Sequence, residues 1–288
     1  RMKRILLSLI LGLFCLSISA EGIWDEARHF RFRHQKLERE YWLYMPENLP
    51  EGAPLVFLLH GYSGKAKGYF PALLEEGRRS GFAVCIPNGW PDARGKNCWN
   101  VGYPFQEGLK TDDVDFLCRL ARHLQKEYGF DRRATFVTGM SNGGEMCYIL
   151  AARKSDVFRA VAPISGLQMV WAMREYRPQR PVPLMEIHGT LDKTSRWEGD
   201  PDNRDGWGEY TSVPVAVGNW VAANGCTWCE HSELPLKTPE SNRVILHRYL
   251  GGEAEVRLYE VIGGKHSKHE QDMDTAAEIW QFFRQYLP

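Results

Sequence analysis

A serine set between glycines is the first feature of the sequence that could do chemistry. Residues 139–143 read Gly-Met-Ser-Asn-Gly, between an apolar run at 134–138 and a helix-like run at 145–152. The glycines permit a sharp turn that exposes a serine hydroxyl above a sheet, and the helix start offers N–H groups to an oxyanion. An ordinary strand-to-helix turn would explain the glycines equally well. The pattern therefore predicts Ser141 as a nucleophile only if partners for it are found.

Candidate partners for the serine follow strand-like runs further along the chain. A serine hydroxyl needs a base to take its proton and an acid to orient that base. Asp192 closes His-Gly-Thr-Leu-Asp after the run at 183–187, and His266 closes Gly-Gly-Lys-His after the run at 255–261. We favour these two because each lies soon after a strand. Competing candidates are His269 for the base and, for the acid, Asp200, Asp202 and Asp205.

Two backbone N–H groups are candidates for holding the oxyanion. One usually belongs to the residue after the nucleophile, here Asn142, and the other to a loop after an early strand. His60-Gly61-Tyr62-Ser63-Gly64 directly follows the apolar run at 55–59. The sequence therefore predicts the N–H groups of Tyr62 and Asn142 as the oxyanion hole.

Apolar and helix-like runs alternate along the chain and must position these residues. The expected strands are 41–45, 55–59, 82–86, 134–138, 161–164, 183–187, 244–249 and 255–261. The expected helices are 70–79, 112–128 (with Thr111 as its cap), 145–152, 214–223 and 275–286. This alternation predicts a mostly parallel central sheet with helices on both faces. Ligands of such sheets bind beyond the carboxyl ends of the strands, where the candidate residues lie.

The charge balance excludes one class of partner. The chain has 36 basic and 36 acidic residues, and without residues 1–20, which hold three basic residues and no acidic one, the net charge is −3. A mildly acidic chain lacks the electrostatic signature of a nucleic-acid-binding protein. With 43% hydrophobic and 25% charged residues, the composition is that of a folded protein.

The first 20 residues resemble an export signal. Lys3 and Arg4 precede the apolar run 5–16, and the small residues Ser17, Ser19 and Ala20 follow it. We predict a signal peptide at 1–20, with cleavage after Ser19 or Ala20 left open, and a secreted or periplasmic protein without stable membrane insertion after its removal. An uncleaved anchor is less favoured because the run is shorter than a spanning helix needs, and a lipoprotein attached through Cys15 is weaker still.

Six cysteines remain after Cys15, and an even number in an exported chain permits disulfides whose pairing the sequence leaves open. They are Cys85, Cys98, Cys118, Cys147, Cys226 and Cys229. Cys226-Thr-Trp-Cys229 lacks the second ligand pair of a zinc site, so local structural cysteines are favoured. We expect no metal and no cofactor.

Five motifs occur in an order that resembles a known family. They are Leu58-Leu59-His60-Gly61, Cys98-Trp99-Asn100, Gly139 to Gly144, His188-Gly189-Thr190-Leu191-Asp192 and Gly264-Lys265-His266. Together they resemble the polyhydroxybutyrate-depolymerase-like and feruloyl-esterase group of α/β-hydrolases, in carbohydrate esterase family one. The resemblance extends from about Tyr41 to the C-terminus.

This resemblance implies an α/β-hydrolase fold and a cofactor-free serine esterase that cleaves acyl groups, often feruloyl or acetyl, from plant polysaccharides such as xylan. We expect one catalytic domain at 21–288, with Ser141, Asp192 and His266 as its triad. The acid loop departs from the group, because Lys193-Thr-Ser-Arg-Trp197 replaces its usual Val-Pro pair. Flat rings suit aromatic acids and sugars, so the substrate-binding candidates are Trp99, Tyr103, Trp197 and Trp207.

Two other functions compete with this prediction. A depolymerase of aliphatic polyester would use the same triad on a different ester. A non-catalytic carbohydrate-binding protein on the same fold would need no triad, so the complete set of candidate residues argues against it. A peptidase of similar fold is less favoured because no propeller-like domain is present.

Overall fold

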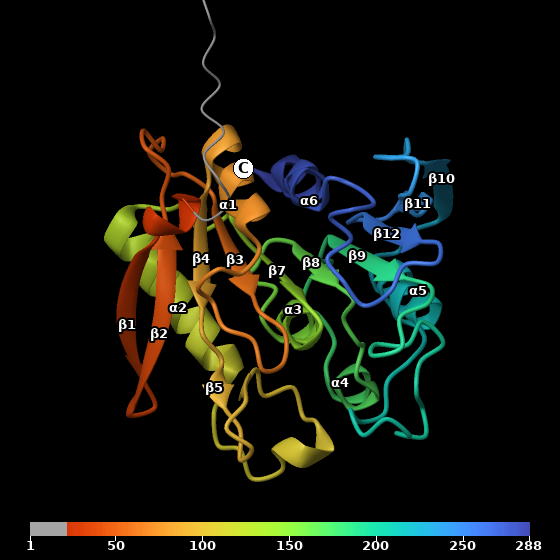
Figure 1. Ribbon diagram of the computed structural model, residues 1–288, viewed down its shortest axis with the longest axis horizontal. Helices are drawn as coiled ribbons and strands as arrows, with labels where there is room; N and C mark the ends of the chain where they lie inside the picture. The colour runs from red at the N-terminus through yellow and green to blue at the C-terminus, as the bar shows by residue number, and fades with distance from the viewer. Residues whose placement is uncertain (1–21) are drawn as a thin grey trace, which may run out of the picture.

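The computed structural model describes residues 22–288, so the predicted signal peptide at 1–20 lies outside the described residues. Strands and helices alternate along most of the chain (Figure 1). The strands are β1 (Arg28–His34), β2 (Leu37–Tyr44), β3 (Leu55–Leu59), β4 (Ala83–Pro87), β5 (Trp90–Pro91), β6 (Asn97–Cys98), β7 (Thr135–Met140), β8 (Val161–Ile164), β9 (Leu184–Gly189), β10 (Trp228–Glu233), β11 (Val244–Leu250) and β12 (Val256–Val261). The helices are α1 (Pro71–Ser80), α2 (Asp113–Tyr128), α3 (Asn142–Arg153), α4 (Val170–Glu175), α5 (Val213–Ala223) and α6 (Thr275–Phe283), with 3₁₀ turns at Gly22–Asp25, Pro104–Gln106 and Arg284–Tyr286.

The main sheet is parallel at its centre and antiparallel at its edges. Its order is β1-β2-β4-β3-β7-β8-β9-β12-β11-β10. The six strands from β4 to β12 run parallel, while β1-β2 and β10-β11 add antiparallel pairs at the two edges. The carboxyl ends of β3, β7, β9 and β12 therefore reach the same edge of the sheet, where the candidate residues follow them.

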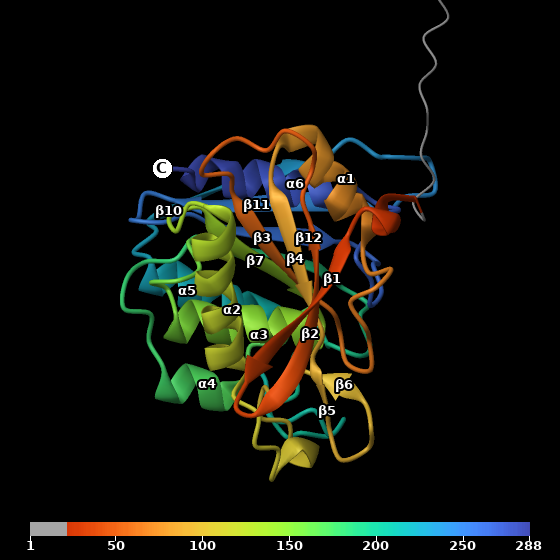
Figure 2. The same ribbon diagram turned by 90° about the vertical axis from the view of Figure 1, so that its left-hand side faces the viewer.

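Helices cover both faces of the sheet, as the alternation predicted. Helices α1 and α6 lie on one side of the sheet and α2, α3, α4 and α5 on the other (Figure 2). Their side chains belong to two separate cores, the first with α1 and α6 and the second with the other four helices. Strand β3 shows why its sequence is apolar throughout: Val56 and Leu58 belong to the first core, while Leu55, Phe57 and Leu59 belong to the second. A strand buried on both faces needs no polar alternation.

The structure corrects two local expectations. The N-cap of α2 is Asp112, whose side chain accepts a hydrogen bond from the Asp115 N–H, so Thr111 is not the cap. Helix α3 begins at Asn142, directly after the serine, rather than at Glu145. None of the helices within residues 22–288 has the length and apolar character of a membrane-spanning segment. All six cysteines of this range are free thiols.

Candidate active site

Ser141 lies in a strained turn between β7 and α3. Its backbone has φ +56° and ψ −125°, which non-glycine residues adopt only where surrounding contacts enforce it. A Cβ on Gly143 would lie 2.3 Å from the Leu59 carbonyl oxygen, and one on Gly139 would lie 2.8 Å from Leu59 Cβ. The two glycines therefore let the turn pack against the end of β3, which is the expected geometry of an exposed nucleophile.

Asp192 and His266 are joined by a direct hydrogen bond. His266 Nδ1 lies 2.7 Å from Asp192 Oδ2, and Asp192 Oδ1 accepts the N–H groups of Thr194 and Ser195 at 2.8 and 2.9 Å. Burial alone would raise the pKa of Asp192, but the hydrogen bond and charge of His266, aided by the charge of His188, hold it below its ordinary value. An ionised, fully bonded carboxylate is suited to orient an imidazole.

The acid and histidine loops are held together by their backbones. The Leu191 N–H donates to the Gly264 carbonyl at 2.9 Å, and the Gly263 N–H donates to Thr190 Oγ1 at 2.8 Å. A Cβ on Gly189 would lie 2.3 Å from the Gly264 oxygen. Glycine at this position therefore permits the close approach that brings Asp192 to His266.

The loop after β8 connects the turn that carries Ser141 to the loop that carries His266. The Ser141 N–H donates to the Ile164 carbonyl at 2.8 Å, and Ser165 Oγ donates to the Ser267 carbonyl at 3.3 Å, so the loop after β8 links the two sides. Within residues 22–288, no hydrogen bond joins Ser141 Oγ to His266. Catalytic hydrogen bonds are often long in a ligand-free site and shorten when substrate binds.

The competing histidine, His269, bonds Asp272 and Ser267 rather than the candidate acid. His269 is buried, and its Nδ1 lies 3.2 Å from Asp272 Oδ2 and 3.4 Å from Ser267 Oγ. His266 keeps part of its side chain exposed, as a base that meets substrate requires. All three competing acids pair with arginines of their own loop: Asp200 and Asp202 with Arg204, and Asp205 with Arg196.

The two predicted oxyanion donors are free and close to the serine. A Cβ on Gly61 would lie 3.4 Å from Ser141 Cβ and 3.9 Å from Ser141 Oγ, so this loop runs past the nucleophile. Neither the Tyr62 N–H nor the Asn142 N–H donates to another group among residues 22–288. Both are therefore available to a ligand oxygen.

A neutral histidine fixes the loop that carries Tyr62. The Gly89 N–H donates to His60 Nε2 at 2.9 Å, so the His60 proton must be on Nδ1, which bonds the Gly61 carbonyl at 2.7 Å. Burial lowers the pKa of His60 to about 4, which keeps this ring uncharged at neutral pH. His60 therefore orients the peptide group that joins Gly61 to Tyr62 and contains the Tyr62 N–H.

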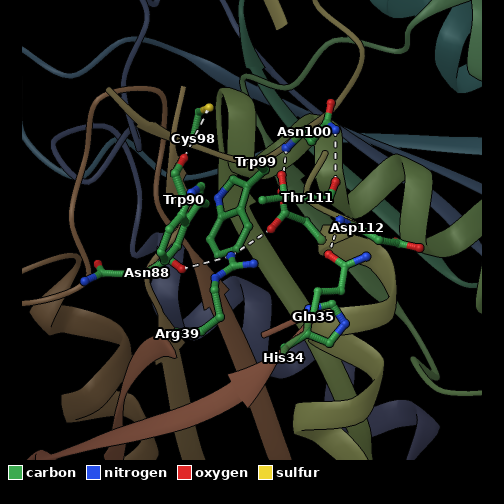
Figure 3. Close-up of polar contacts among 12 residues, drawn as sticks. His34, Gln35, Arg39, Asn88, Trp90, Cys98, Trp99, Asn100, Thr111 and Asp112 are labelled. Carbon is green, nitrogen blue, oxygen red and sulfur yellow. Dashed lines mark hydrogen bonds and ion pairs between the residues drawn. The ribbon is translucent and has the colours of Figure 1, made fainter. Parts of the chain in front are cut away.

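The structure gives Trp99 a supporting position rather than an open one. Its ring is fully buried, its Nε1 donates to the His60 carbonyl at 2.8 Å, and its backbone pairs with the Asn142 side chain. Asn100 follows Trp99, and its N–H donates to Asp113 at 2.8 Å. Asp113 in turn pairs with buried Arg39 at 2.7 Å (Figure 3). This segment thus braces the nucleophile turn and offers no ring to a substrate.

Four aromatic side chains form a cluster beside the oxyanion loop: Tyr62, Tyr103, Phe105 and Trp207. Their ring centroids are 5.0–6.5 Å apart. Tyr103 is buried and donates its hydroxyl to Glu145, whereas the other three are partly exposed. Of the predicted binding residues, Trp207 therefore has an accessible ring in this cluster. Trp197 instead makes an edge-to-face contact with buried His188, with ring centroids 6.1 Å apart.

Sequence reasoning missed several residues around the site. Phe105 and the Tyr62 side chain complete the aromatic cluster. The available signals were the nearness of Phe105 to Tyr103 in the chain and the place of Tyr62 in the predicted oxyanion loop. Glu145, Glu186 and His188 are fully or almost fully buried. The signal for them was a charged residue inside an apolar helix or strand, because such groups need partners when buried. Within residues 22–288, no three His, Cys, Asp or Glu side chains gather as a metal ion would require.

The chain is similar in sequence to curated esterases. A bifunctional acetylxylan esterase/xylanase of Neocallimastix patriciarum is 28% identical over 171 residues, which cover 58% of this chain and 23% of that protein. Feruloyl esterase B of Piromyces equi is 25% identical over 244 residues, covering 82% of this chain and 42% of that protein. This chain thus spans less than half the length of these curated relatives.

The fold and the family are established by two further matches. The acetyl xylan esterase from Aspergillus awamori superposes with a TM-score of 0.62 at 16% identity, over 90% of this chain and 100% of that one, which shows the α/β-hydrolase fold. The family model described as "Putative esterase" matches residues 35–210, which include Ser141 and Asp192. The match covers well over half of the sequence, and the chain therefore belongs to this esterase family.

Proposed function

We propose that this protein is a serine esterase that hydrolyses feruloyl or acetyl esters on plant polysaccharide such as xylan. The observation that carries the proposal is the 2.7 Å bond between His266 and Asp192, at the sheet edge where Ser141 lies in a strained turn. Its family membership and its acetylxylan and feruloyl esterase relatives support the reaction class.

In the proposed reaction, Ser141 Oγ attacks the ester carbonyl and His266 Nε2 accepts its proton. Asp192 holds His266 Nδ1 and stabilises the imidazolium that forms. The carbonyl oxygen, now negative, receives hydrogen bonds from the N–H groups of Tyr62 and Asn142. The His266 proton then passes to the departing alcohol, and water, activated by the same imidazole, releases the acid from Ser141.

The aromatic cluster supports a flat substrate group. Tyr62, Phe105 and Trp207 present partly exposed rings next to the oxyanion loop, where the acyl group or a neighbouring sugar would lie. The Arg94 guanidinium stacks on Phe105 at 4.0 Å and covers one side of that ring. Rings of this kind bind aromatic acids and sugar faces through apolar contact. Such polymers lie outside cells, which fits the secreted or periplasmic location predicted from residues 1–20; that location stays a prediction.

One experiment tests both the reaction and the substrate. Parent, Ser141→Ala and the exposed control Ser232→Ala are assayed on methyl ferulate, acetylated xylan and polyhydroxybutyrate. We expect parent and control to release ferulate or acetate, and Ser141→Ala to be slower by about 10⁴-fold or more. Trp207→Ala should raise KM on methyl ferulate more than on acetylated xylan if the cluster holds an aromatic acyl group.

Two outcomes would count against the proposal. Turnover of polyhydroxybutyrate alone would replace the substrate class with the aliphatic polyester. Parental activity in Ser141→Ala on every ester would remove the serine mechanism altogether.

A further inference from the structure

Behind the catalytic pair lies a second imidazole, His188, that the reaction above does not use. Its Nε2 is 2.7 Å from the Ser195 carbonyl and 3.7 Å from Asp192 Oδ2, the same oxygen that binds His266. Its Nδ1 is 2.8 Å from Glu186 Oε1. The side chains of His188 and Glu186 have no exposed surface. His188 therefore bridges two buried carboxylates.

The hydrogen-bond pattern indicates that His188 carries a positive charge. A carbonyl oxygen can only accept, so Nε2 must be protonated toward Ser195. Glu186 Oε1 already accepts the Gly166 N–H at 3.3 Å, and Oε2 accepts the Tyr148 hydroxyl at 2.8 Å. Burial raises the pKa of Glu186, and the bonds from His188, Tyr148 and Gly166 oppose this rise. Because donors reach both oxygens of the carboxyl group, we assign the shared proton to His188 Nδ1.

The surrounding elements hold this imidazolium in place. Glu186 and His188 are alternate residues of β9, so both point to the face covered by α3, which supplies Tyr148. The Trp197 ring stands edge-on to His188 on another side. The His188 ring thus ties the acid loop, through Ser195, to the sheet and to α3.

Several other titratable groups face this cluster, and none replaces the charge of His188. From α3 come Glu145, Cys147 and Tyr148, whose burial raises the pKa of each group. From the loop after β12 come His266 and buried His269. Burial lowers the pKa of His269, and the positive charge of His188 lowers it further, although the partner Asp272 opposes both.

We propose that His188 is a charged positioning residue that fixes the acid loop and sets the pH range in which the Asp192–His266 pair works. This inference rests on the proposed function. Its physical basis is that Asp192 Oδ2 is shared between two imidazoles, so the His188 charge stabilises the ionised acid and repels positive charge on the neighbouring ring.

The direction of the effect follows from the charges. Burial on its own would lower the pKa of His188, but Glu186, the Ser195 carbonyl and Asp192 together raise it. If this charge is removed, the ionised form of Asp192 loses a stabilising partner and positive charge on the neighbouring imidazole is no longer repelled. Both changes move the acid limb of the kcat/KM profile in the same direction, toward higher pH.

The test measures kcat/KM against pH for the parent and His188→Gln, in which the amide can still donate to the Ser195 carbonyl. We expect the acid limb to move up by about one pH unit. Glu186→Gln should give the same shift, because its amide can donate to Nδ1 of a neutral His188 and still accept the Tyr148 hydroxyl, with loss of the bond from the Gly166 N–H. Glu186→Gln therefore still tests the proposal if His188→Gln fails to fold.

Tyr148→Phe is the matched control, since it removes a hydrogen bond from Glu186 and no charge. It should lower the melting temperature and leave the acid limb in place. If both glutamine variants fold and keep the parental acid limb to within about 0.2 units, His188 is only structural and the inference fails. Parental activity in Ser141→Ala would instead overturn the proposed function, so the two failures are distinguishable.

Discussion

The two halves of the active-site edge hold equally buried groups, which are neutral in one half and charged in the other. The nucleophile half, at the ends of β3 and β7, contains His60 and Glu145; the acid half, at the end of β9, contains Glu186, His188 and Asp192. The side chains of His60 and His188 are both fully buried and each precedes a glycine. His60 bonds only backbone groups and is neutral, whereas His188 lies between carboxylates and is charged.

This difference shows that burial keeps His60 and Glu145 neutral, whereas the carboxylates around His188 outweigh the effect of burial. It also matches what each half must do in the proposed reaction. Negative charge develops beside Tyr62 and Asn142, so a neutral Glu145 behind the serine avoids repelling it. Positive charge develops on His266, and Asp192 must be ionised to stabilise it.

Among the variants that test the contrast between the two halves, His60→Gln should have the largest effect on kcat. The flexible glutamine amide has a donor and an acceptor but does not place them where the two nitrogens of the rigid His60 ring lie, so it holds the peptide that carries the Tyr62 N–H less firmly. We expect kcat to fall by about 10²-fold, in the range for loss of one oxyanion donor. Since the pKa of His60 is about 4, the acid limb of the pH profile above pH 5 should not move.

The same substitution at His188 is the matched comparison. Profiles of kcat/KM against pH would separate the two sites, with a lower rate and no shift at His60, and a shift at His188. An equal shift in both variants would show that His60 also carries charge, and the proposed contrast between the halves would be lost.

An effect on stability rather than on rate is expected from Glu145→Gln. Burial raises the pKa of Glu145 from 4.5 to about 8, so between these pH values the folded chain keeps a proton that the unfolded chain has lost. Rising pH then favours the unfolded chain, by up to about 4 kcal/mol at pH 8. Denaturant unfolding of Glu145→Gln should depend less on pH across this window than unfolding of the parent.

The exposed Glu47→Gln serves as control and should keep the parental slope. A parental slope in Glu145→Gln as well would mean that Glu145 is ionised in the folded chain, which would contradict the neutral character of the nucleophile half.

The sequence predicted the parts of the fold whose signal is local. Strand β3 is an unbroken apolar run with the predicted bounds, and the glycines around Ser141 mark its turn. Strands β1 and β10 were not predicted because they are largely or wholly exposed and carry no apolar pattern. Their strand conformation depends on pairing with β2 and β11, which lies outside any local window.

Residue type alone could not give side-chain direction. Trp99 and Trp207 are equal as aromatic residues in the sequence, but one ring is buried under the oxyanion loop and the other is partly open. Polar residues within β9 carried no period that would reveal the Glu186–His188 pair. The spacing of each catalytic candidate after a strand was informative because parallel strands bring their carboxyl ends together.

Active-site labelling tests the central claim, a nucleophilic Ser141 served by His266, most directly. The parent is treated with a fluorophosphonate, and the adduct is located by intact mass and peptide mapping. We expect one adduct on Ser141, no adduct in Ser141→Ala, and strongly slowed labelling in His266→Gln. An adduct on another residue, or parental labelling of either variant, would contradict the account.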